Sequence, residues 1–207
     1  ITGGTDFHHD GHEGACLMRS AYEIKTAEDL WTVIKRNWNE EYSGGGISWK
    51  QSQPASKNSC SNGPAGIIAA RLYKLNGKKK SDLDWAKKIF EWQTDKLVDT
   101  NGKVYDHITN HETGERMDWI FTYNQGTYMG MAHELYTITK EQRYLDQANK
   151  AATYCITHLI DKNNNILKNE GDSGDGGLFK AVFVRYFVKL LLEESLTTAD
   201  RNKYTIF

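Results

Sequence analysis

One plan recurs along the chain and limits what it can fold into. An apolar helical segment ends near a tyrosine, a short polar turn follows, and a more charged amphipathic segment begins. Copies of this plan cover residues 19–31, 70–86, 132–148 and 184–204. Repetition at this scale is typical of stacked supersecondary units. The sequence therefore predicts an all-α protein of about eight helices in four hairpins.

The spacing of apolar residues supports this prediction. Between Tyr144 and Leu159 they recur at every third or fourth position, which places them on one helix face. Residues 139–142, Thr-Lys-Glu-Gln, have the residue types of a capping box and predict the start of that helix. Trp31, Trp85 and Trp92 lie on the second, more charged helices of their hairpins, the outer helices, and are expected in the core. With 207 residues, 39% of them hydrophobic, we expect a single domain over residues 1–207.

A polar, glycine-rich stretch precedes the apolar helix of each hairpin, at residues 8–14, 57–66, 121–130 and 170–180. If the hairpins stack in one sense, these four stretches meet on one rim. The free N–H groups and positive ends of the helices gather there, which suits hydroxyl-rich or anionic ligands. Capped helix starts are also polar and glycine-rich, so for a single stretch this simpler reading stays open.

Charge and cysteine content exclude other classes of function. The net charge is -1, which gives no electrostatic reason to expect nucleic acid or a membrane surface. No apolar run reaches the roughly 18–20 residues of a membrane span. Cys16, Cys60 and Cys155 are scattered and odd in number, which matches neither a disulfide framework nor a zinc site. We expect a monomer without a cofactor.

Five long motifs occur in order along the chain: GGGISWK (44–50), KNSCSNGPAGIIAARLY (57–73), DWAKKIFEW (84–92), FTYNQGTYMGMAHELY (121–136) and GDGGLFKAVFVRYF (174–187). From about residue 9 to its end, the chain resembles glycoside hydrolase family 76, the bacterial endo-α-1,6-mannanases. The resemblance implies an (α/α)6 toroid, a retaining mechanism and α-mannan polysaccharide or oligosaccharide as the bound partner. It also implies a secreted, periplasmic or cell-surface location. A complete toroid has twelve helices, so the eight expected here predict an incomplete one.

The resemblance places the family's adjacent catalytic aspartates on His9 and Asp10. Asp10 matches the acid/base, whereas a histidine stands where the nucleophile is expected. Retaining glycosidases need two carboxyl groups about 5 Å apart, and Asp6 or Glu13 are alternative sources of the second one. The departure at His9 leaves a second function open, a catalytically impaired relative that binds mannan. Asp10 could also be only a helix N-cap.

A metal site is the alternative reading of the same stretch. His8 and His12 are four residues apart and would share a helix face with Asp10 between them. The order of residues is not that of the H-E-x-x-H motif, and no further histidine or cysteine completes a ligand set. We therefore assign no metal site.

Candidate sugar-binding residues come from the other polar stretches. Amides and a phenol can bond sugar hydroxyls, and an indole can stack on a sugar ring, although caps, turns and core packing are the alternative roles. The loop 171–177 could also orient hydroxyls or hold calcium, but it lacks the spacing of an EF-hand. The candidates are Trp49, Asn62, Tyr123, Asn124, Gln125, Asp172, Asp175 and Lys180.

Overall fold

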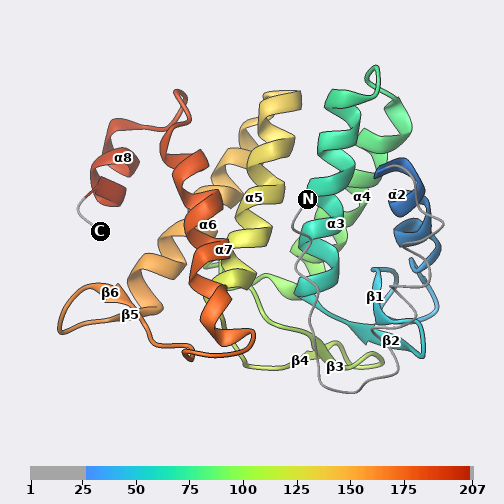
Figure 1. The fold of residues 1–207 in the computed structure, drawn as a ribbon, viewed down its shortest axis with the longest axis horizontal. Helices are drawn as coiled ribbons and strands as arrows, with labels where there is room; N and C mark the ends of the chain where they lie inside the picture. The colour runs from blue at the N-terminus through green and yellow to red at the C-terminus, as the bar shows by residue number, and fades with distance from the viewer. Residues whose placement is uncertain (1–26, 206–207) are drawn as a thin grey trace.

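The computed structural model describes residues 27–205, which form seven α-helices and three small antiparallel sheets of two strands each (Figure 1). The elements in chain order are α2 (Ala27–Arg36), β1 (Ser48–Lys50), β2 (Gln53–Lys57), α3 (Ser59–Leu75), α4 (Lys80–Leu97), β3 (Ile108–Asn110), β4 (Glu115–Arg116), α5 (Thr122–Thr139), α6 (Gln142–His158), β5 (Ile160–Asp161), β6 (Ile166–Leu167), α7 (Gly176–Leu191) and α8 (Thr198–Thr205). The prediction of an all-α protein built from helical hairpins is confirmed.

The helices form two layers. Helices α3, α5 and α7 stand side by side in one layer, and α4 and α6 pack behind them as the returning arms of the hairpins (Figure 1). The three β-hairpins all lie at the end where α3, α5 and α7 begin, spread along it from β1–β2 to β5–β6 (Figure 1). The stretches 57–66, 121–130 and 170–180 therefore share one rim, as the sequence predicts. The fourth stretch, 8–14, lies outside the described residues.

Small residues bring the helices of the first layer close together. A Cβ atom built on Gly126 of α5 would lie 2.6 Å from the Cα atom of Phe183 in α7. A Cβ atom on Gly63 of α3 would lie 2.8 Å from the Cβ atom of Thr127 in α5. Because real Cβ atoms do not approach so closely, the packing distance between these helices requires glycine at both positions.

Aromatic side chains join the two layers. The ring of Phe90 in α4 stacks on Tyr128 of α5 at 5.5 Å and meets Tyr144 of α6 edge-on at 4.9 Å. All three are buried, and such pairs stabilise beyond the area they bury. Trp31 and Trp92 are also buried, and Trp85 packs against the core, which confirms the expected position of the three tryptophans.

The capping box predicted at residues 139–142 is wrong. Helix α5 continues through Thr139 and ends at Lys140, whose φ of 58° is left-handed. Helix α6 starts at Gln142, and its N-cap residue, Glu141, makes no side-chain cap. Because Thr139 still has helical geometry, its hydroxyl accepts a bond from the N–H of Glu141 at 3.2 Å instead of capping α6.

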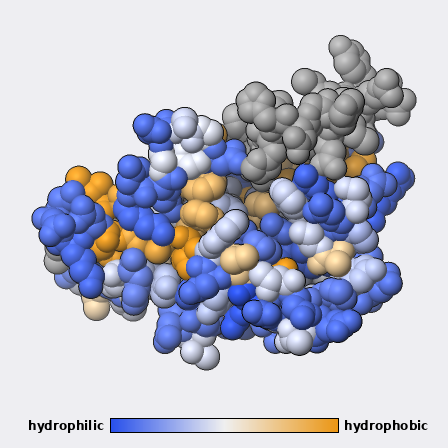
Figure 2. Space-filling view, turned by 90° about the horizontal axis from the view of Figure 1, so that it is seen from below, coloured by the Kyte–Doolittle hydropathy of each residue, from blue (hydrophilic) through white to orange (hydrophobic). Residues whose placement is uncertain are grey.

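One side of α7 remains exposed although it is apolar. Leu178, Val184, Val188 and Leu192 are between 45% and 73% exposed, whereas Phe183 and Phe187 on the same helix are buried. Seen from the hairpin end, the molecule is mostly hydrophilic, with its larger hydrophobic area on the side of α6, α7 and α8 (Figure 2). No helix within residues 27–205 is long and apolar enough to span a membrane.

Candidate active site

A short extended segment, residues 104–107, crosses the rim between the starts of α3 and α5. The N–H of Ser59 donates to the carbonyl of Asp106 at 2.7 Å, and the Ser59 hydroxyl donates to the carbonyl of Tyr105 at 2.6 Å. The Gln125 amide donates to the carbonyl of Val104 at 3.1 Å. Side chains and free N–H groups of two helix starts therefore fix three consecutive carbonyls of this segment.

The segment presents a carboxylate whose two oxygens are both bonded. The Tyr123 hydroxyl donates to Asp106 Oδ1 at 2.6 Å, and His107 Nδ1 lies 2.8 Å from Asp106 Oδ2. Asp106 is 8% exposed. Because an ionised carboxylate only accepts hydrogen bonds, Nδ1 is the protonated nitrogen of His107 when Asp106 is charged. This arrangement holds Asp106 in one orientation, and each oxygen keeps a lone pair for a further donor.

A row of aromatic rings runs along the rim from this carboxylate to α7. Trp119, which is 56% exposed, lies edge-on to His107 at 6.0 Å and 6.5 Å from Phe121. Phe121 and Tyr123 stack at 6.0 Å, and Phe179 lies 4.5 Å from Tyr123. We call Trp119, Phe121, Tyr123 and Phe179 the aromatic row. Apolar ring faces beside fixed polar atoms suit a ligand with both C–H and hydroxyl surfaces.

The start of α5 is held by an acidic side chain from the loop before α7. Glu170 accepts from the N–H of Thr122 through Oε1 at 2.7 Å and from the Thr122 hydroxyl through Oε2. A carboxylate at this position satisfies a free N–H group and interacts favourably with the helix dipole. The Lys168 ammonium donates to the carbonyl of Ile120 at 2.7 Å. These bonds fix the loop 168–171 against the aromatic row.

A buried lysine organises the other side of the rim. The Lys57 side chain is fully buried, and its ammonium donates to the carbonyls of Gly46 and Asn39 at 2.7 and 3.2 Å and to the Ser48 hydroxyl at 3.1 Å. No carboxylate faces this ammonium among residues 27–205. Burial therefore lowers the pKa of Lys57 from 10.5 to about 8. The lysine holds the glycine loop that leads into β1.

Residues 123–125 all lie at the rim, but their side chains have different surroundings. Tyr123 faces Asp106, and the Gln125 side chain is committed to the backbone of Val104. Asn124 is completely buried, and neither its amide nitrogen nor its side-chain oxygen has a hydrogen-bond partner among residues 27–205. A buried polar side chain without partners is unusual and marks a place where a ligand or water can bind.

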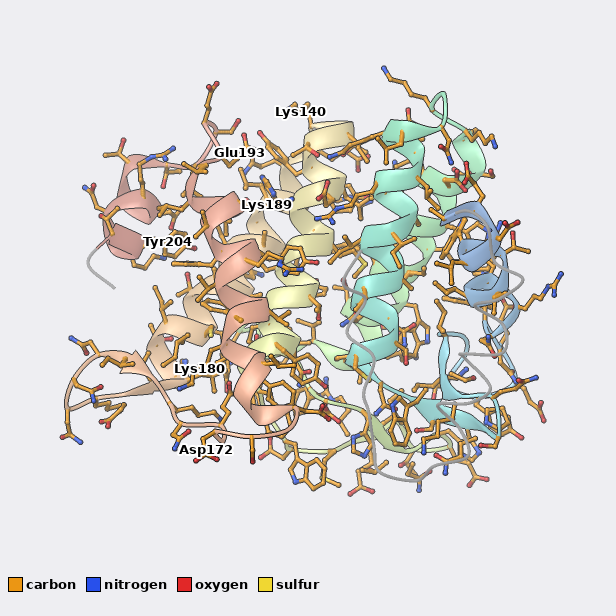
Figure 3. All side chains as sticks on the ribbon, in the orientation of Figure 1. Lys140, Asp172, Lys180, Lys189, Glu193 and Tyr204 are labelled. Atoms are coloured by element: carbon orange, nitrogen blue, oxygen red, sulfur yellow. The ribbon has the colours of Figure 1, made fainter. Side chains whose placement is uncertain are left out.

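The remaining candidates occupy the same end of the molecule. Asn62 is fully buried, and its amide bonds the backbone of Ile47 in both directions, at 2.8 and 3.0 Å, which ties α3 to the loop before β1. The Lys50 ammonium lies 4.4 Å from the centre of the Trp49 ring. Asp172 and Lys180 both lie at the hairpin end of α7 (Figure 3), and Asp175 is the residue before that helix. All these assignments stay predictions, and His9 and Asp10 lie outside the described residues.

Sequence reasoning missed Asp106, His107 and Glu170. The signal for the first two was weak, an Asp-His pair in the connection between two helices. Glu170 stood in a stretch already recognised as part of the rim, but its partner Thr122 is 48 residues away.

Comparisons with known proteins identify the family of this chain. The family model for glycosyl hydrolase family 76 matches residues 21–204. The α-1,6-mannanase GH76A of Salegentibacter sp. HEL1_6 superposes with a TM-score of 0.78 and is 43% identical, over 92% of this chain and 58% of that one. One of its structures is an inactive variant, with two consecutive aspartates changed to alanine, in complex with α-1,6-mannotetrose. A mannan endo-1,6-alpha-mannosidase of Candida glabrata is 30% identical over 76% of this chain and 37% of the relative.

Stacked helical hairpins that gather polar and aromatic groups on one rim define an all-α class of protein built from hairpin repeats. The chain belongs to glycosyl hydrolase family 76. It spans somewhat over half the length of the Salegentibacter enzyme and about a third of the Candida relative.

Proposed function

We propose that this chain supplies the substrate rim of an enzyme that hydrolyses α-1,6 linkages within mannan backbones. The observation that carries the proposal is the buried Asp106 carboxylate, held by Tyr123 and His107 beside the exposed Trp119. The free lone pairs of Asp106 can accept hydrogen bonds from sugar hydroxyls while the aromatic row packs against the face of the sugar ring. Family membership and the names of the relatives support mannan as the substrate.

The chemical step is proposed to follow the retaining mechanism of the family. Asp10 is the acid/base that protonates the leaving oxygen, and a second carboxylate attacks the anomeric carbon from about 5 Å away. His9 stands at the expected nucleophile position, so Asp6 and Glu13 are the alternative sources of that carboxylate. Asp106 binds and orients substrate in this scheme and takes no covalent part.

A second candidate function is a mannan-binding relative with impaired catalysis. His9 favours it, because an imidazole does not readily replace the attacking carboxylate. The Salegentibacter variant that lost two aspartates is described as inactive and yet in complex with α-1,6-mannotetrose. That protein therefore forms the complex without either aspartate side chain.

One experiment separates the two functions. Parent, His9→Asp and Asp10→Asn proteins are incubated with linear α-1,6-mannan, and released reducing ends are counted while calorimetry measures the binding of mannotetraose. The enzymatic proposal expects turnover that His9→Asp increases and Asp10→Asn abolishes, with the first product in the α configuration by NMR. Binding without turnover in the parent would support the binding protein. Full activity in Asp10→Asn would place the acid/base elsewhere.

Location and assembly follow from the same proposal. Mannan is a long polysaccharide, so an enzyme that cuts it acts where the polymer is found, outside the cytoplasm. We therefore keep the secreted, periplasmic or cell-surface location implied by the family, and a monomer, as parts of the proposal. Sedimentation of the purified protein tests the second part.

A further inference from the structure

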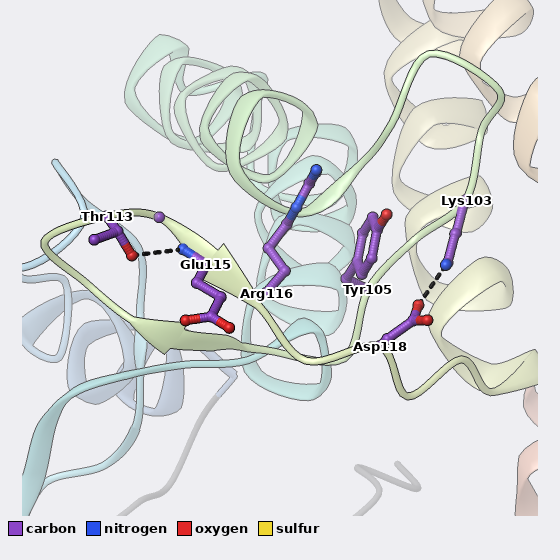
Figure 4. Close-up of a pocket in the computed structure, with 7 residues that line it drawn as sticks. Lys103, Tyr105, Thr113, Glu115, Arg116 and Asp118 are labelled. Atoms are coloured by element: carbon purple, nitrogen blue, oxygen red, sulfur yellow. Dashed lines mark hydrogen bonds and ion pairs between the residues drawn. The ribbon is translucent and has the colours of Figure 1, made fainter.

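The outer side of the β3–β4 hairpin contains an open basin with a volume of about 600 Å³ (Figure 4). We define it by the side chains of Lys103, Tyr105, Glu115, Arg116 and Asp118. No residue of α3, α5 or α7 lines it. Tyr105 packs toward Trp92, Leu97 and Ile108, whereas the next residue, Asp106, faces Tyr123 of α5. The basin and the rim therefore lie on opposite sides of one extended segment.

The basin keeps hydrogen-bonding groups that the protein does not use. The Arg116 guanidinium lies 4.1 Å from the centre of the Tyr105 ring and makes no hydrogen bond or ion pair with any residue of 27–205. The Glu115 carboxylate likewise has no partner in that part of the chain. Lys103, 4.6 Å from the same ring, is paired with Asp118. The Arg116 guanidinium thus lies against the Tyr105 ring, and the Glu115 carboxylate belongs to the neighbouring residue of β4, which also lines the basin.

Charge identifies the class of ligand. Lys103 and Arg116 contribute +2 and Glu115 and Asp118 contribute -2, so the basin carries no net charge. A polyanion or a cation would gain little there, and a single half-buried ring offers little to an apolar molecule. A neutral polyol can accept hydrogen bonds from the guanidinium and donate hydrogen bonds from its hydroxyls to a carboxylate. The open shape suits a segment of polymer better than an enclosed small molecule.

The basin and the aromatic row meet at consecutive residues of the chain. Asp118 lines the basin, and the next residue, Trp119, is the exposed end of the aromatic row. A sugar chain on the aromatic row that extends past Trp119 and around the end of the extended segment would approach the basin. We infer that the basin is a remote subsite for a neutral polysaccharide, which binds a distant part of the same mannan chain that occupies the rim. The inference rests on the proposed function for the identity of the polymer.

The test measures binding, so it does not depend on turnover. Parent, Arg116→Ala and Glu115→Ala proteins are compared by affinity electrophoresis in gels containing α-1,6-mannan and by calorimetry with mannotetraose. Arg36→Ala, an exposed arginine on α2, is the matched control. Loss of the guanidinium is expected to weaken binding to the polymer about tenfold, as one or two charge-assisted bonds disappear. Binding of mannotetraose, which the proposed function places on the rim alone, should stay within about twofold.

The possible outcomes separate this inference from the proposed function. Polymer binding by Arg116→Ala equal to that of the parent, in protein shown to be folded by circular dichroism, overturns the remote subsite even if mannan is hydrolysed. If the parent hydrolyses no mannan but Arg116→Ala binds the polymer more weakly than the parent does, the subsite stands and the enzymatic proposal fails. If Arg116→Ala does not fold, Glu115→Ala decides, because its exposed side chain has no structural partner. A parent that binds no mannan overturns both.

Discussion

The hydroxyl of Tyr123 donates to the carboxylate of Asp106 across 2.6 Å, although one residue lies in the first turn of α5 and the other in the connection that follows α4. The bond fixes both partners, because Asp106 is also held by His107 and its backbone carbonyl by Ser59. If the rim binds substrate as proposed, the carboxylate is already oriented, which reduces the entropy lost on binding.

The first prediction concerns this bond. Tyr123→Phe keeps the ring in the aromatic row but removes a hydrogen bond to a charged group, worth about 1.5–3 kcal/mol. We expect kcat/KM on α-1,6-mannan to fall about tenfold or more, and Asp106→Asn to cost at least as much. Arg36→Ala, at an exposed residue of α2, is the control. Unchanged kinetics in both rim variants would remove Asp106 from the site.

The second prediction concerns Lys57. Its pKa is about 8 in the folded protein and 10.5 when exposed, so the unfolded chain binds more protons between these values. The free energy of unfolding should therefore rise with pH across that window, by up to about 1.4 kcal/mol per pH unit. Urea titrations of the parent and Lys57→Met at pH 7 to 10.5 measure the difference in slope. If the free energy of unfolding changes with pH in the same way in both proteins, the pKa of Lys57 is not lowered.

The third prediction concerns Glu134, at the opposite end of the first layer from the rim. Burial alone would raise the pKa of Glu134, but the bonds from Lys74 at 2.5 Å and Arg71 at 2.9 Å lower it overall from 4.5. The stabilisation is therefore complete above pH 4.5 and is lost as the pH falls through the lower, folded-state pKa. Acid unfolding followed by circular dichroism should show this loss in the parent and not in Glu134→Gln.

The Glu134→Gln variant should also be less stable than the parent at pH 7. An amide bonds the two cations more weakly than a carboxylate and leaves positive charge uncompensated in a partly buried place. Thermal unfolding at pH 7 provides this second measurement. If Glu134→Gln is as stable as the parent at pH 7 and unfolds in acid as the parent does, the ion pairs of Glu134 with Lys74 and Arg71 do not hold α3 and α5 together.

The fourth prediction concerns Gly126. An alanine there would place its methyl group against the backbone of Phe183, which cannot move without shifting α7. We expect Gly126→Ala to lower the free energy of unfolding by about 1–3 kcal/mol, as in overpacked cores. Gly177→Ala is the control, since its nearest contact would be 3.4 Å and it lies on an exposed turn of α7. It should be neutral or stabilising by up to about 1 kcal/mol.

The sequence alone determined the helical hairpins and the end of the molecule at which polar groups gather. Both follow from local patterns, since a helix face is read from the spacing of residues such as Tyr144 and Leu145 along one segment. The direction of the first helix of each hairpin decides at which end of the molecule its polar start lies. The rim could therefore be predicted once stacking in one sense was assumed.

Only the tertiary structure decided which polar residues of the rim meet. Thr122 and Glu170 are 48 residues apart in the sequence. Asp106 and Tyr123 bond each other although the whole β3–β4 hairpin lies between them in the sequence. Such pairs depend on the distance between packed helices, which Gly126 and Phe183 set, and on the path of the connections between them. Asn62 shows the same limit, because its amide belongs to the polar stretch in sequence but bonds the backbone of Ile47 in space. Spacing along a chain records the local geometry of each element, whereas the partners of a side chain depend on how distant elements pack.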